Sequence, residues 1–257
     1  MIDQLWLILL GFAAGILGSM LGLGGGIIVV PVLTFLGFSS TAAASNSLFA
    51  ALSNAVASTI SYSRQKRIEF SLGLKLGLLT IPGTVLGAVI STDVTPSIFK
   101  ILFGLVLIAS VAYIFLRKKI ETKEKTISKQ MMVFAVGASF FAGIISAFFG
   151  IGGGIIFVPL MVAGMGMAMK KAAPTSQLIL LFSSLSGVIA HSALGHPDFN
   201  QAGFLAIGSF IGGLVGARLS LDVKERYLQI LVSIVILAAA AKLFFDSVSD
   251  NSSFLGF

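Results

Sequence analysis

The stretch that decides the fold is AGILGSMLGLGGGIIVVP, residues 14–31, because it returns 128 residues later as AGIISAFFGIGGGIIFVP, residues 142–159. Three consecutive glycines interrupt a helix, and a broken helix is tolerated in lipid only where it packs against protein or lines a cavity. Paired interruptions at matching positions of two halves are typical of binding sites in secondary transporters. The repeated stretch therefore bears on both the architecture and the function.

Composition indicates an integral membrane protein. Of the 257 residues, 56% are hydrophobic and 11% are charged, whereas a soluble domain carries about 25% charged residues. The apolar runs have the length that helices need to cross a bilayer and lack the strict alternation of barrel strands. We expect an all-α polytopic membrane protein in contact with the lipid bilayer. The net charge of +7 is attributed to cytoplasmic loops, so no nucleic-acid partner is expected.

Apolar runs and helix breakers divide each half of the chain into five segments. We predict about 8–10 transmembrane segments in two repeats, residues 1–116 and 130–257, joined by a basic cytoplasmic linker at 117–129. The second segment of each half is short, so it either barely crosses or forms a re-entrant piece. The predicted segments are 5–22, 26–38, 42–62, 71–91, 98–116, 131–149, 154–168, 172–193, 201–219 and 228–246.

Basic residues fix the expected orientation. They gather at 64–67, in the linker, at 170–171 and at 224–226, whereas the loops near Asp93 and Asp198 have no Lys or Arg. The positive-inside rule places the four basic loops in the cytoplasm. Five crossings per half would put both termini outside and make the second half the inverse of the first. The prediction is two inverted repeats with broken or short helices.

The glycine triplets are candidate anion sites. Each precedes a short helix, where free backbone N–H groups and the positive end of the helix dipole attract an anion without any charged side chain. The alternative is that the glycines let helices pack closely, which we favour for Gly11, Gly15, Gly18 and Gly143.

Small polar residues open the third segment of each half, and Asn54 follows two turns later in the first. Such residues line cavities in a membrane protein, or they bond to neighbouring helices and cap helix ends. The predicted substrate-binding residues are Gly24, Gly25, Gly26, Asn46, Ser47, Asn54, Gly152, Gly153, Gly154, Thr175, Ser176 and Gln177.

Few residues could carry other chemistry. No acidic residue lies in the middle of a predicted segment, and the chain has two histidines and no cysteine. No catalytic residue, metal site or cofactor is therefore expected, and the glycine triplets lack the Lys-Ser/Thr of a nucleotide-binding loop. His191, at a predicted helix end, is interpreted as an interfacial residue, with a proton carrier as the alternative.

The duplicated pattern, GLGGG followed by Pro31 and GIGGG followed by Pro159, resembles the TauE/SafE family of bacterial anion exporters. The resemblance implies a two-repeat helical bundle in a prokaryotic plasma membrane that carries small sulfur-containing anions, such as sulfite, sulfoacetate or another organosulfonate. We expect a secondary transporter, working as an exporter by alternating access, rather than an enzyme. A passive anion channel and a membrane-embedded enzyme are the alternatives.

Overall fold

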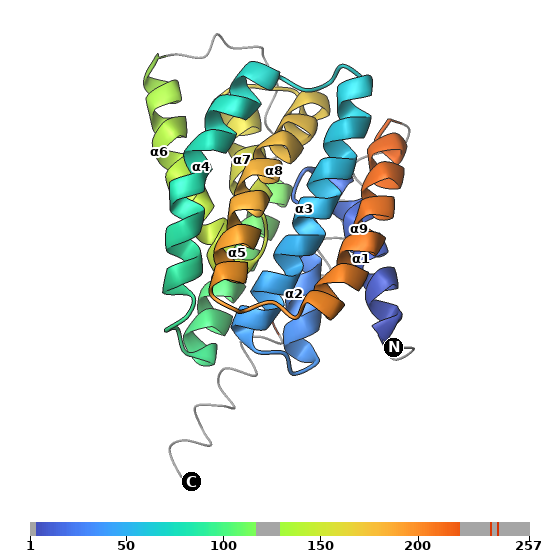
Figure 1. The fold of residues 1–257 in the computed structure, drawn as a ribbon. Helices are drawn as coiled ribbons and strands as arrows, with labels where there is room; N and C mark the ends of the chain where they lie inside the picture. Colours follow the sequence, from blue (N-terminus) through green and yellow to red (C-terminus); the bar gives the residue numbers. More distant parts are fainter. Residues whose placement is uncertain (1–3, 117–128, 222–236, 238–240, 242–257) are drawn as a thin grey trace.

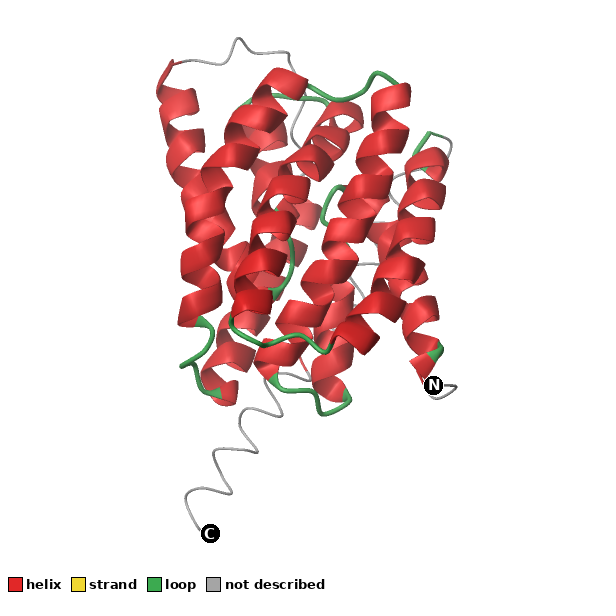
Figure 2. Cartoon of the chain, in the orientation of Figure 1, coloured by secondary structure: helices red, strands yellow, loops and turns green. Residues whose placement is uncertain are grey.

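The computed structural model describes residues 4–116, 129–221, 237 and 241. All regular structure in these residues is helical (Figure 2), as the composition predicted. Four helices, Phe70–Ile90, Gln130–Phe149, Met169–Ala193 and Phe199–Leu219, are long and apolar enough to cross a membrane. The predicted segment 228–246 and the basic loop at 224–226 lie outside the described residues. The helices are α1 (Trp6–Leu21), α2 (Gly26–Phe35), α3 (Ser40–Arg64), α4 (Phe70–Ile90), α5 (Pro96–Leu116), α6 (Lys129–Phe149), α7 (Gly154–Pro159), α8 (Met169–Ala193) and α9 (Phe199–Leu219).

The short segments form hairpins that enter the bundle from opposite ends. Helix α1 runs inward from the end that carries the N-terminus, and α2 returns to the same end (Figure 1). Helices α6 and α7 make the matching hairpin from the other end. With 10 residues, α2 is about 15 Å long, half of the roughly 30 Å that a span requires. The re-entrant interpretation of the short segments is therefore the correct one, and the two hairpins are inverted relative to each other.

The segment expected at 154–168 is not one continuous α-helix. Helix α7 ends at Pro159, and a π-helical turn, Leu160–Gly164, follows it directly. Proline has no N–H to donate to the carbonyl four residues earlier, and its ring crowds that carbonyl. Proline alone does not dictate the break, because Pro31 at the matching position lies inside α2, which continues to Phe35. In the wider turn after Pro159, the Met165 N–H donates to the Leu160 carbonyl oxygen at 3.1 Å, and the continuous apolar run in the sequence gives no sign of it.

The two repeats interlock rather than lying side by side. Helix α1 packs on α9 of the second repeat, and α6 packs on α4 of the first, while α3 and α8 meet in the middle. A Cβ on Gly212 would strike the carbonyl oxygen of Phe12, and a Cβ on Gly83 would strike that of Phe140. Close backbone approach of this kind requires glycine. It confirms the packing interpretation of the helix-face glycines Gly11, Gly15 and Gly143, which meet the α9 or α4 backbone in the same way.

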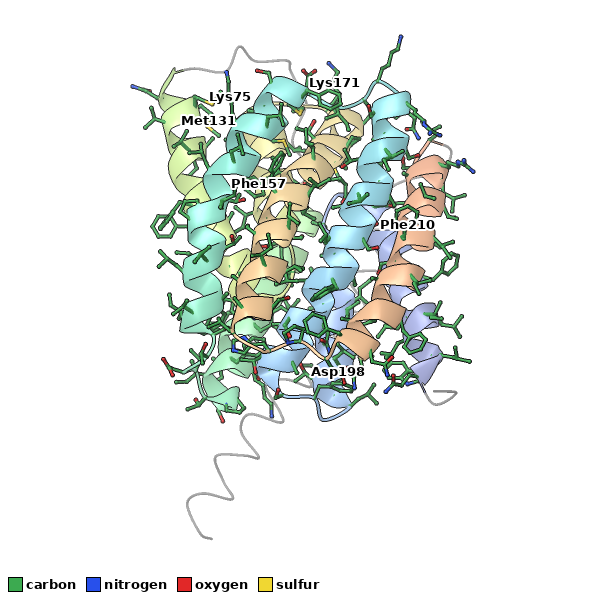
Figure 3. The ribbon with its side chains drawn as sticks, in the orientation of Figure 1. Lys75, Met131, Phe157, Lys171, Asp198 and Phe210 are labelled. Carbon is green, nitrogen blue, oxygen red and sulfur yellow. The ribbon has the colours of Figure 1, made fainter. Side chains whose placement is uncertain are left out.

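Charge differs between the two ends of the bundle. Lys75 and Lys171 lie at one end and Asp198 at the other (Figure 3). Arg64, Arg67 and Lys171 belong to the same end, because Arg67 and the α8 start are hydrogen-bonded. We call this the basic end. Between the two ends, the outer faces of α4, α6 and α9 expose large apolar side chains, as helices facing lipid do.

Candidate functional site

The two glycine-rich turns meet inside the bundle. We define the first glycine loop as residues 22–26 and the second as residues 150–154. Gly22 and Gly150 both have positive φ, 71° and 72°, a conformation that glycine adopts at no steric cost. A Cβ on Gly26 would overlap the carbonyl oxygen of Gly150, and a Cβ on Gly154 would overlap that of Gly22. Each loop therefore packs against the backbone of the other, at a pseudo-twofold junction between the repeats.

Two serines, one from each repeat, form hydrogen bonds across this junction. The Ser47 hydroxyl donates to the Gly150 carbonyl oxygen at 2.8 Å, and the Ser176 hydroxyl donates to the Gly22 carbonyl oxygen at 2.7 Å. Both side chains are fully buried. The serines were predicted to contact substrate, but here their hydroxyl hydrogens are committed to holding the two loops in place.

Most of the triplet amides are unpaired. The Gly24 N–H donates to the Gly18 carbonyl oxygen at 3.3 Å. Within the described residues, no acceptor is found for the N–H groups of the other five glycines of the predicted site. All six lie in the buried interior. An unpaired buried N–H is rare in folded proteins, so the five donors gathered at this junction are an unusual feature of the bundle interior. The five are Gly25, Gly26, Gly152, Gly153 and Gly154.

Asn46 and Thr175 tie each repeat to a loop of the other. Asn46 accepts from the Asp198 N–H at 3.0 Å and donates to the Gln201 side chain at 3.1 Å. Thr175 accepts from the Glu69 N–H at 3.0 Å. These contacts are pseudosymmetric, since Glu69 and Asp198 each precede a helix of the opposite repeat. In the observed conformation, Asn46 and Thr175 thus bond to neighbouring helices, which was the alternative to lining a cavity.

The two remaining predicted residues, Gln177 and Asn54, each combine one paired and one unpaired side-chain atom. Gln177 donates its side-chain N–H to the Gly18 carbonyl oxygen at 2.9 Å, and its own Oε1 is unpaired. Asn54 packs beside Gly213 of α9, accepts from Ser58, and leaves its Nδ2 unpaired. The structure therefore brings Gln177 to the α1 end that carries the first glycine loop and places Asn54 at the α3–α9 contact.

Two further serines lie at the second glycine loop and were not predicted. Ser146 of α6 and Ser184 of α8 are fully buried, and neither side-chain oxygen has a hydrogen-bond partner in the described part of the chain. Their repeat counterparts are Gly18 and Ala55. This departure from the internal repeat was the signal in the sequence that could have revealed them.

His191 is buried, which corrects its interpretation as an interfacial side chain. Its Nε2 lies 3.0 Å from the Ala147 carbonyl oxygen, and its Nδ1 lies 2.8 Å from Nδ1 of His196. The first contact requires a proton on Nε2, so a neutral His191 accepts at Nδ1 from His196. Tyr62 makes the equivalent contact in the first repeat, donating to the Ser19 carbonyl oxygen at 2.9 Å.

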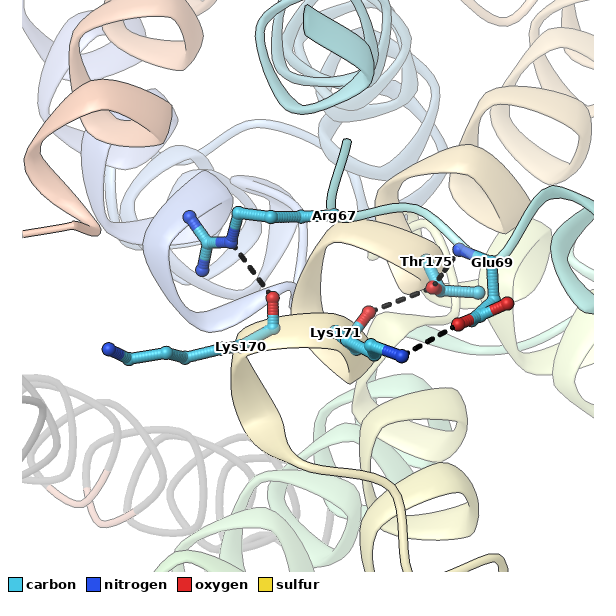
Figure 4. A network of polar contacts seen from close by, with 5 residues as sticks. All are labelled: Arg67, Glu69, Lys170, Lys171 and Thr175. Atoms are coloured by element: carbon cyan, nitrogen blue, oxygen red, sulfur yellow. Dashed lines mark hydrogen bonds and ion pairs between the residues drawn. The ribbon is translucent and has the colours of Figure 1, made fainter. Parts of the chain in front are cut away.

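The start of α8 is held at the basic end by a polar network (Figure 4). Pro174 cannot donate to the Lys170 carbonyl oxygen, and Arg67 Nε occupies that acceptor at 2.9 Å. Lys171 forms an ion pair with Glu69 at 3.0 Å. The network links the α3–α4 connection to the α8 start, so the basic residues of these loops also have a structural role.

A cleft of about 250 Å³ opens at the same end, between α3 and α9. It is lined by Arg64, Gln65 and Arg218, together with Ile60, Ser61 and Leu214. None of these residues belongs to the glycine loops. The cleft lies near the bundle surface, whereas the predicted site is enclosed.

Comparison with known proteins identifies the family of this chain. The sequence profile of the sulfite exporter TauE/SafE family matches residues 7–243. The chain belongs to the TauE/SafE family.

The chain is similar to other members along nearly their whole length. It is 28% identical to a probable membrane transporter protein, YunE, of Bacillus subtilis, covering 94% of this chain and 97% of the relative. It is 27% identical to a probable membrane transporter protein of Methanocaldococcus jannaschii, covering 90% and 91%. It is 25% identical to YfcA of Escherichia coli, also named a probable membrane transporter protein, over 91% of this chain and 87% of the relative. No solved structure matches the chain. As a TauE/SafE protein, the chain is a membrane transporter.

Proposed function

We propose that this TauE/SafE protein exports a small sulfur-containing anion, such as sulfite, sulfoacetate or another organosulfonate, across the prokaryotic plasma membrane. The observation that carries the proposal is the set of unpaired amides at the two glycine loops. Oriented backbone N–H groups at helix starts bind anions without a cationic side chain. The basic end would face the cytoplasm, as the positive-inside rule requires.

The arrangement of the helices supports alternating access. The α1–α2 hairpin opens toward one end of the bundle and the α6–α7 hairpin toward the other, and their closed ends meet at the junction. An anion at the junction is released to one side when one hairpin moves relative to α3 and α8, and to the other side when its counterpart moves. The buried junction then corresponds to an occluded conformation between these two.

Flux measurements on purified protein in liposomes test the proposal. Sulfite, organosulfonates and carboxylates are loaded in turn, with and without a pH gradient. We expect saturable efflux of a sulfur oxyanion that is accelerated by the same anion on the opposite side. Efflux that rises without saturation and shows no counter-transport would indicate a passive channel instead.

A matched pair of glycine variants tests the site. Gly152 and Gly195 have similar positive φ values, 77° and 73°, so alanine strains the backbone alike at both. A Cβ on Gly152 would lie 3.2 Å from Leu180 Cδ2 and 3.4 Å from Ser184 Oγ, whereas no atom of the described residues lies within 4 Å of a Cβ on Gly195. We expect Gly152→Ala to raise the substrate concentration for half-maximal flux and Gly195→Ala to leave it unchanged. Equal effects of the two variants would refute a role for the glycine loops in substrate binding.

A further inference from the structure

Two buried hydroxyls of the second repeat lack a partner, although similar groups around them are paired. Ser146 and Ser184 have no exposed area, and neither oxygen forms a hydrogen bond with any residue that the structure describes. The neighbouring Ser183, in contrast, donates to the Gly152 carbonyl oxygen at 2.7 Å. Leaving a buried hydroxyl unpaired costs about 1–3 kcal/mol. The cost is explained if these groups meet an acceptor in another step of the transport cycle.

Both serines lie against the second glycine loop. Ser184 Oγ is 3.4 Å from the position of a Cβ on Gly152, and Ser146 Cβ is 3.5 Å from the position of a Cβ on Gly153. The loop thus lies next to one serine of α6 and one serine of α8. The amides of Gly152, Gly153 and Gly154 are unpaired within the described residues. Two hydroxyls and three amides at this loop therefore have no hydrogen-bond partner within the described residues.

The first glycine loop has no equivalent set. Its positions corresponding to Ser146 and Ser184 are Gly18 and Ala55, which have no hydroxyl. The Gly24 amide is bonded to the Gly18 carbonyl oxygen, which also accepts from Gln177. The repeat fold is therefore compatible with non-polar residues at these positions, and the serines are not needed to form it.

We propose that the acidic group of the substrate binds off the pseudo-twofold axis, at the second glycine loop, with Ser146 and Ser184 as hydrogen-bond donors. The inference rests on the proposed function and adds the binding residues and the charge of the ligand. The buried polar residues that the structure describes include no Lys, Arg, Asp or Glu. Because the cost of burying an ion rises steeply with its charge, neutral donors select a singly charged oxyanion, a sulfonate or hydrogensulfite, over a dianion.

Alanine variants of the two serines, in the full-length protein in detergent, test this assignment. Binding of ethanesulfonate, sulfite and acetate is measured by calorimetry, and the melting temperature is measured without ligand. Ser146→Ala and Ser184→Ala should each weaken ethanesulfonate binding about 10- to 100-fold, the loss of one hydrogen bond to a charged group. Neither variant should lower the ligand-free melting temperature, because neither hydroxyl has a partner to lose.

Ser139→Ala is the matched control. Ser139 is a fully buried serine of the same helix, α6, whose hydroxyl donates to the Ala135 carbonyl oxygen at 2.7 Å. Ser139→Ala should leave the affinity for ethanesulfonate unchanged. The charge preference has its own readout, since sulfite should bind more tightly, relative to ethanesulfonate, as the pH is lowered through neutrality and hydrogensulfite accumulates. A constant ratio would overturn the preference for a monoanion.

The outcomes separate this inference from the proposed function. If the wild type binds and transports sulfonate while both serine variants bind it equally well, the assignment of the site is wrong and the function stands. If acetate alone binds, and does so through the two serines, the site stands and the proposed substrate class is wrong. If none of the three anions binds to the wild type, both are overturned.

Discussion

Replacing Ser176 with alanine removes the hydrogen bond that joins α8 to the first glycine loop. In the described residues, the Ser176 hydroxyl is the only donor to the Gly22 carbonyl oxygen, at 2.7 Å. The side chain is fully buried, so the carbonyl oxygen loses its donor in the interior of the bundle. An unpaired buried acceptor costs about 1–3 kcal/mol. For a chain of this size, that corresponds to a melting temperature lower by about 2–12 °C.

The assay is thermal unfolding of the detergent-purified variant, with Ser139→Ala as its control. The Ala135 carbonyl oxygen, which Ser139 contacts, lies within α6 and keeps its helical N–H donor when the hydroxyl is removed. Ser139→Ala should therefore shift the melting temperature much less than Ser176→Ala. Ser47→Ala should match Ser176→Ala, because it removes the symmetric bond to Gly150. If Ser176→Ala and Ser139→Ala have the same melting temperature, the hydrogen bonds of Ser47 and Ser176 do not stabilise the junction between the glycine loops.

Two further predictions concern helix packing and pH. A Cβ on Gly212 would strike the Phe12 carbonyl oxygen, while no atom of the described residues lies within 4 Å of a Cβ on Gly203 in the same helix. Gly212→Ala should therefore lower the free energy of unfolding by about 1–3 kcal/mol, whereas Gly203→Ala should be neutral or stabilising. Thermal unfolding of the two variants measures the difference. Desolvation lowers the pKa of His196, which lies in the α8–α9 connection. As the pH falls below about 6.5, the unfolded chain then binds more protons than the folded one, so the melting temperature should fall with the pH. The fall should be smaller in His196→Gln. An identical pH profile for this variant would exclude His196 as the source.

The sequence alone determined the membrane class, the duplication and the inversion, because these depend on composition, spacing and the distribution of charge. Glycine triplets 128 residues apart predict two helix breaks at matching positions whatever surrounds them. Within the described residues, helix bounds followed apolar runs to within a few residues, except after Pro159, where a π-helical turn replaces the expected continuation. The family, too, was identified from the repeated glycine motif.

Only the tertiary structure decided which polar groups are paired, because a hydrogen bond between residues about 100 or more positions apart leaves no periodic trace in the sequence. Ser47 and Ser176 were equal candidates for substrate contact until the fold placed the carbonyl oxygens of Gly150 and Gly22 in front of them. Ser146 carried no signal beyond its difference from Gly18. The fold made it a candidate by burying it, unpaired, beside the second glycine loop. Composition and spacing thus determine that helices break and where, whereas the packing of the two repeats determines which donors remain free for an anion.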